Sequence, residues 1–145
     1  MRVMAIDPGP STGIALWDTD DELPWATTLQ RHEAEDFIVE KIAKQAVHLV
    51  ICEEFVITAG TAKKGRMGSE SIEMIGVVKY FCRECDVELK FGRPSDAMKF
   101  ATNEKLKRIG WYQTGPEHAR DALRHLLTWA ALNRKVDVKK LLPSD

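Results

Sequence analysis

The order of the expected strands and helices constrains the fold of this chain more than any other feature of its sequence. Three strand-like segments follow one another at the start, and helices and strands alternate from there on. The expected strands are 2–7, 11–17, 23–31, 47–55 and 87–91, and the expected helices are 33–46, 69–85, 94–101, 103–109 and 116–134. Successive strands suit an antiparallel meander, whereas helical crossovers lead to parallel pairing. We therefore expect an α/β fold with one mixed five-stranded sheet flanked by helices.

The length of 145 residues predicts a single domain. We expect that domain over residues 1–134, followed by a polar C-terminal tail, 135–145, that frays. No apolar run reaches the roughly 20 residues that cross a bilayer, so no membrane partner is expected. The three cysteines, an odd number without a secretion signal, favour reduced thiols and a cytoplasmic location. Cys82 and Cys85 lack further ligands at zinc spacing, so we expect them to pack on a helix.

Carboxylates stand where two of the expected strands end. Asp7 closes the first strand, and Glu53 and Glu54 follow the apolar run 49–52. Each has an ordinary explanation, as a turn former before Pro-Gly or as a solvated strand end. If these two strands are neighbours, however, Asp7 and one of the glutamates converge at one edge of the sheet, because side chains alternate along a strand.

The last expected helix adds further metal-ligand side chains. His118, Asp121 and His125 follow i, i+3, i+7 spacing and share one helix face. Oxygen ligands with one imidazole suit Mg²⁺ or Mn²⁺ better than zinc. Two such ions, about 3.5–4 Å apart, are the usual device for in-line phosphodiester hydrolysis.

Three segments resemble the RuvC-type Holliday junction resolvases, nucleases of the RNase H-like superfamily, and so compact a chain resembles their bacteriophage members. The similar segments are 5–13 (AIDPGPSTG), 50–55 (VICEEF) and 118–125 (HARDALRH). The resemblance implies an RNase H-like fold, a homodimer, and a two-metal site in each subunit that cuts branched DNA in a bacterial or phage-infected cell. By position it assigns the catalytic and metal-binding roles to Asp7, Glu53, His118 and Asp121 and leaves Glu54 as a bystander.

The resemblance also guides the choice of DNA-binding residues. Members of the family carry an aromatic side chain, the wedge, that opens the junction. The wedge position corresponds to Val56 in this chain, whereas the aromatic residue Phe55 lies one position before it. Which of the two residues opens a junction is left undecided. Lys105 is the best match to a basic residue near the scissile phosphate. The candidate DNA contacts are Lys63, Lys64, Arg66, Lys99, Lys105, Lys107, Arg108 and Phe55.

The net charge of -1 argues at first sight against a polyanionic partner. Residues 58–110, however, hold eleven basic and seven acidic side chains, whereas 18–40 hold eight acids and one arginine. The total therefore conceals a basic face and an acidic face. A nuclease acting on RNA or on forks and flaps, and a module that binds branched DNA without cutting it, remain the alternatives to a junction-cutting enzyme.

Overall fold

The computed structural model describes residues 1–56 and 66–144, and its five strands form one sheet in the order β3-β2-β1-β4-β5. The strands are β1 (Arg2–Asp7), β2 (Ser11–Asp18), β3 (Trp25–Gln30), β4 (Leu49–Glu53) and β5 (Glu88–Gly92). β2 pairs antiparallel with both β1 and β3, whereas β4 pairs parallel with both β1 and β5. The expected mixed sheet is confirmed. Its first and fourth strands are neighbours, which is the condition for Asp7 and a glutamate to converge.

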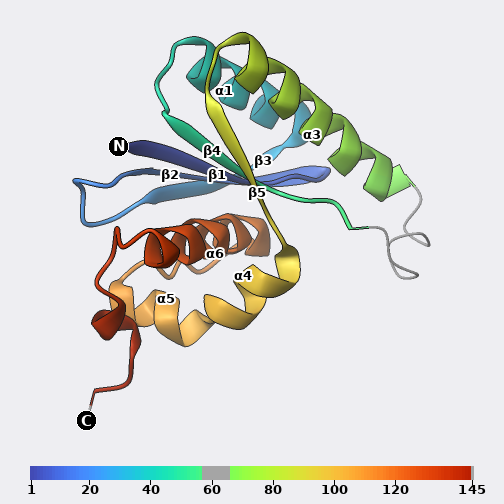
Figure 1. Cartoon of the computed structure of the whole chain (residues 1–145). Coiled ribbons are helices and arrows are strands. Elements are labelled where there is room, and N and C mark those ends of the chain that lie inside the picture. The colour runs from blue at the N-terminus through green and yellow to red at the C-terminus, as the bar shows by residue number, and fades with distance from the viewer. Residues whose placement is uncertain (57–65, 145) are drawn as a thin grey trace.

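Helices cover both faces of this sheet (Figure 1). α1 (Arg31–Ala43) and α3 (Arg66–Glu84) lie on one face, and α4 (Pro94–Phe100), α5 (Asn103–Ile109) and α6 (Glu117–Leu132) lie on the other. The last expected helix is thus confirmed to within two residues at each end. Among the helices of the described residues, none combines the length and the apolar character that a membrane span requires.

The alternation of side chains along β1 and β4 divides the core into two layers. Val3 and Ala5 share a cluster with the leucines of α6, and Leu49 and Ile51 lie in the same cluster. The alternate residues of the same strands, such as Met4 and Ile6 of β1, point to the opposite face and pack with α1 and α3. Because every second residue of a strand shares a face, Asp7 and Glu53 continue the series that faces α6.

The C-terminal segment is more ordered than its polar composition indicates. Residues Val138–Leu141 form a 3-10 helix, η1, with Leu141 buried to 2% exposure in the cluster beneath α6. The Arg108 guanidinium donates a hydrogen bond of 3.0 Å to the Leu141 carbonyl. The expectation that this tail frays is therefore wrong for η1, because the buried Leu141 side chain anchors it in a cluster whose other members lie far away in the sequence, and Val136 packs against the same cluster.

We expect Leu141→Ala to destabilise the protein by about 2–5 kcal/mol, the range for truncating a buried leucine. Leu142 is the matched control, because its side chain is 60% exposed and its truncation costs at most about 0.5 kcal/mol. Urea unfolding of the two variants measures the difference. Equal effects of the two substitutions would show that η1 does not pack on the domain.

Candidate functional site

The site begins where β1 and β4 end side by side. Ile6 pairs with Cys52 in the parallel register, so the next residues, Asp7 and Glu53, are neighbours at one sheet edge. Asp7 is 7% exposed. Its burial, followed by the nearby charges of Glu53 and Asp121, raises the pKa of Asp7 from 3.8 to about 9. The structure therefore places a carboxyl group where its charged form is strongly disfavoured without a counter-ion.

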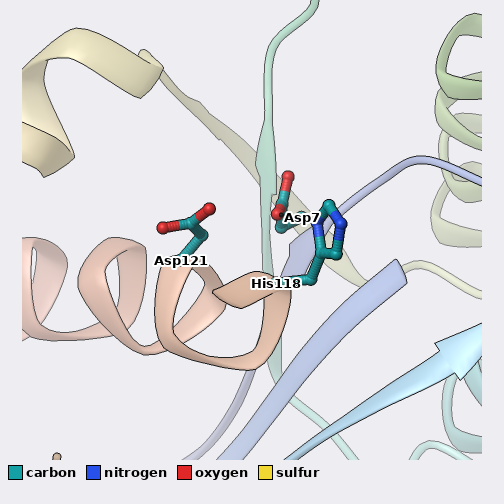
Figure 2. A group of neighbouring side chains, drawn as sticks. All are labelled: Asp7, His118 and Asp121. Atoms are coloured by element: carbon teal, nitrogen blue, oxygen red, sulfur yellow. Dashed lines mark hydrogen bonds and ion pairs between the residues drawn. The ribbon is translucent and has the colours of Figure 1, made fainter. Parts of the chain in front are cut away.

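The first turns of α6 bring two more ligand groups to this edge. His118 Nδ1 lies 3.0 Å from Asp7 Oδ2, and Asp121 lies one turn further along the same side of α6 (Figure 2). One ligand atom from each of Asp7, His118 and Asp121 can be chosen so that all three lie within 4.8 Å of one another. Burial and the charge of Glu117 also raise the pKa of Asp121, although Arg124 opposes that shift.

The approach of α6 to the sheet depends on Gly13, which pairs with Asp7 across β1 and β2. A Cβ atom at Gly13 would lie 1.9 Å from the carbonyl oxygen of His118, so the helix backbone occupies the space that any side chain would fill. The Ala119 N–H, one of the free donors at the helix start, donates to Thr28 Oγ1 at 3.1 Å. Contacts with β2 and β3 therefore fix the position of the end of α6 that carries His118.

A cleft of about 580 Å³ lies over these groups. Asp7, Glu53, His118 and Asp121 all line it, together with the turn 8–10 and the first residues of α4. Ser71, on α3, donates a hydrogen bond of 3.2 Å to the Pro8 carbonyl and so holds the turn against that helix. The four predicted site residues therefore share one open cleft, and the structure brings them together from three separate elements.

His125 and Arg124 support the cluster from α6. His125 Nε2 lies 2.8 Å from Glu53 Oε2, and Arg124 Nε lies 3.3 Å from Asp121 Oδ1. Arg124 also donates to the Ala101 carbonyl at 2.7 Å and to Asn103 Oδ1 at 2.6 Å. Sequence reasoning placed His125 on the right helix face but gave it no role. Nothing in the local pattern marks Arg124, because its partners in the α4–α5 turn lie more than 20 residues away in the sequence.

The donor set fits a divalent cation. Carboxylate oxygens and one imidazole nitrogen are ligands for hard ions such as Mg²⁺ and Mn²⁺. Buried carboxylates that repel one another are stabilised when a cation binds between them. Burial of the Asp7 carboxyl group is the largest cause of its raised pKa in the metal-free protein, and repulsion by Glu53 and Asp121 adds to it.

The candidate DNA contacts are more scattered. Phe55 is half-buried and packs against Gly68, whereas Val56 is 41% exposed, and both line the cleft. Glu54 also lines the cleft, with its carboxylate 3.4 Å from the Arg93 guanidinium. Lys63 and Lys64 lie outside the described residues, as does the side chain of Arg66 at the start of α3.

The basic side chains of α4 and α5 differ in their exposure and in the contacts that they already make within the protein. Lys99 is exposed on α4, whose first residues line the cleft. Lys105 Nζ lies 4.3 Å from the centre of the Phe100 ring, and Lys107 Nζ lies 4.7 Å from that of Tyr112. The Arg108 guanidinium holds Leu141, so it has a structural partner already.

Comparisons with known proteins show the same architecture. No protein-family model matches the sequence, and no curated protein matches it. The structure is similar to that of RuvC from Thermus thermophilus, with a TM-score of 0.70 and 17% identity over 92% of this chain and 96% of that one. It is also similar to T. thermophilus RuvC in complex with a Holliday junction substrate, with a TM-score of 0.67 and 18% identity over 92% of this chain and 95% of that one. The fold is thus the RNase H-like fold of RuvC, as the resemblance of the three segments implied.

Proposed function

We propose that this protein is a metal-dependent endonuclease of the RuvC type that cleaves branched DNA such as a four-way junction. The convergence of Asp7, Glu53, His118 and Asp121 in one cleft carries the proposal. These groups come from β1, β4 and α6, so only the folded chain assembles them. The likeness of the fold to RuvC, including RuvC with a Holliday junction substrate, supports the choice of substrate.

The chemistry follows from the charge of the site. Asp7, Glu53, His118 and Asp121 would hold one or two Mg²⁺ or Mn²⁺ ions, and the bound ions would supply activation of water and stabilisation of negative charge for phosphodiester hydrolysis. Asp7 is the central ligand, because it is the most buried carboxylate and neighbours the other groups. Arg124 and Asn103 hold Asp121 and the α4–α5 turn in place behind the cleft.

The mouth of the cleft is the proposed path of the DNA backbone. Pro94 and Ser95 line one side of it, and the helix that they begin carries Lys99. Lys105 follows on α5, where Arg124 links Asn103 to the acidic cluster. Lys99 is exposed and Lys105 is partly buried. Cations close to the cleft attract phosphates, so we propose these two lysines as DNA contacts.

Assembly as a homodimer and a phage origin both remain predictions from the resemblance. α3 is the proposed dimer contact. Ile72 and Tyr80 on this helix are each 51% exposed, although its other side packs in the core. Large exposed apolar side chains on one helix mark a candidate contact surface.

Cleavage assays test the proposed function directly. A labelled four-way junction, a fork, a flap and a linear duplex are incubated side by side with Mg²⁺, Mn²⁺ or EDTA. We expect cleavage of branched DNA with either metal, no cleavage of linear duplex, and no cleavage in EDTA. A junction that is retarded in a gel but stays intact would identify a binding module instead. Cleavage of matched RNA substrates alone would identify an RNA-processing nuclease.

A further inference from the structure

His125 is a buried polar side chain whose imidazole contacts the carboxylate of Glu53. Its side chain is 3% exposed, and its Nε2 atom lies 2.8 Å from Glu53 Oε2. The contact joins α6 to the end of β4, two elements separated by 72 positions along the chain. A buried imidazole in this place is costly unless its hydrogen bond is made.

The backbone of β5 leaves room for this imidazole. Gly92 pairs with Glu53 in the parallel register of β4 and β5. A Cβ atom at Gly92 would lie 2.7 Å from His125 Nδ1 and 3.3 Å from Cε1 of the same ring. Any other residue at Gly92 would therefore force the ring or the strand to shift, so Gly92 leaves free the space that the imidazole occupies behind the Glu53 carboxylate.

The chemistry sets the direction of the hydrogen bond. A carboxylate that binds a cation is ionised and only accepts, so in the metal-bound site His125 Nε2 would carry the proton and donate the hydrogen bond to Glu53 Oε2. A donor that holds one oxygen from behind restricts rotation of the Glu53 carboxyl group. The Glu53 side chain is 21% exposed, in contrast to 3% for His125, so the glutamate reaches the cleft and the histidine stays beneath it.

We propose that His125 is a positioning residue that orients the Glu53 carboxylate toward a divalent cation in the cleft, with Gly92 reserving the space for its ring. The proposal rests on the proposed function, because it concerns the same metal site. Hydrogen-bond partners of metal ligands typically contribute about 10–100-fold to metal affinity or activity. His125 acts on the ligand and does not itself contact the cation.

Four variants test the proposal. His125→Leu removes the donor and keeps an apolar side chain of similar bulk, whereas His125→Gln retains an N–H near the position of Nε2. Gly92→Ala keeps the imidazole but displaces it from Glu53. Leu126→Ala is the control, because it truncates the neighbouring buried residue of α6 and leaves the Glu53 contact intact. The measurements are Mn²⁺ affinity by calorimetry and the Mg²⁺ concentration for half-maximal cleavage.

We expect His125→Leu and Gly92→Ala to weaken Mn²⁺ binding by about 10–100-fold. The KM for DNA should stay unchanged, and the Mg²⁺ requirement should rise by the same factor. His125→Gln should recover most of the affinity, and Leu126→Ala should lower stability without changing affinity. This pattern of results would distinguish a role of His125 in positioning the Glu53 carboxylate from a general role in packing.

Wild-type affinity in folded His125→Leu or in Gly92→Ala would overturn the proposal, as would the same loss in Leu126→Ala. If His125→Leu does not fold, the Mn²⁺ affinities of Gly92→Ala and His125→Gln test the proposal instead. If the wild-type protein binds Mn²⁺ but cuts no branched DNA, the proposed function is refuted. The Mn²⁺ affinities of the variants would still test the role of His125. A wild-type protein that binds no Mn²⁺ refutes both.

Discussion

Replacing Asp7 with asparagine should abolish cleavage and at the same time stabilise the metal-free protein. In the proposed function Asp7 is the central metal ligand, so its loss should remove several kcal/mol of metal-dependent transition-state stabilisation. At 1.36 kcal/mol for each factor of ten, the rate should fall by more than about 10³-fold. The amide keeps the size of the side chain, so DNA binding and the fold should be retained.

The gain in stability follows from the raised pKa of Asp7. The unfolded chain loses the Asp7 proton near pH 3.8, whereas the folded, metal-free protein keeps it up to about pH 9. The folded state binds more protons between these values, so its stability falls as the pH rises through that window. Asparagine carries no charge and lacks this penalty. We expect a gain of at least about 1 kcal/mol at neutral pH, or roughly 2–4 °C in Tm.

Thermal unfolding with and without Mn²⁺ measures both effects. Binding at 100 times the dissociation constant should stabilise the wild-type protein by about 2.7 kcal/mol, and Asp7→Asn should lose most of this response. Asp20→Asn is the control, because Asp20 lies exposed between β2 and β3 and lines no part of the cleft. Unchanged cutting by Asp7→Asn, or an equal metal response, would contradict the assignment of the site.

Replacing Gly13 with alanine should disrupt the site through the backbone alone. The added Cβ atom would lie 1.9 Å from the His118 carbonyl oxygen, and a backbone atom cannot move aside as a flexible side chain can. α6 must therefore shift away from β2 and carry His118 and Asp121 away from Asp7. We expect a loss of about 3 kcal/mol, the upper part of the range for overpacking, together with loss of cleavage.

Gly76→Ala is the matched control for this substitution. Gly76 lies within α3, and a Cβ atom there would meet no atom within 4 Å. Alanine should stabilise the helix by about 0.5–1 kcal/mol, because it restricts the unfolded chain more than glycine does. Urea unfolding compares the two variants, and the junction assay measures Gly13→Ala alone, because Gly76 lies between Ile72 and Tyr80 on the face of α3 proposed as the dimer contact. A Gly13→Ala protein with wild-type stability and activity would show that α6 does not press on β2 as described.

Local signals in the sequence predicted some elements closely. Helix 103–109 has the predicted bounds, because Thr102 accepts from the Lys105 N–H as its N-cap and Gly110 ends it at φ 82°. α3 begins earlier than predicted, at Arg66 rather than at residue 69. Gly68, read as part of a loop, lies inside this helix and gives Phe55 room to pack. A glycine that serves close packing looks the same in sequence as one that breaks a helix.

The sequence by itself determined the order of strands and helices, the mixed sheet, and which side chains are candidates for the site. The elements follow from the period of apolar residues, and the candidate side chains follow from carboxylates at strand ends, from the spacing of His118 and Asp121 on one helix face, and from the resemblance of three short segments to a known family. Only the tertiary structure decided which groups meet. The convergence of Asp7 with His118, the contact of His125 with Glu53 and the burial of Leu141 each join residues far apart in the chain. Such contacts depend on the register of the strands, on the space that Gly13 and Gly92 leave free, and on the position of α6 against the sheet. No local sequence pattern encodes these three features.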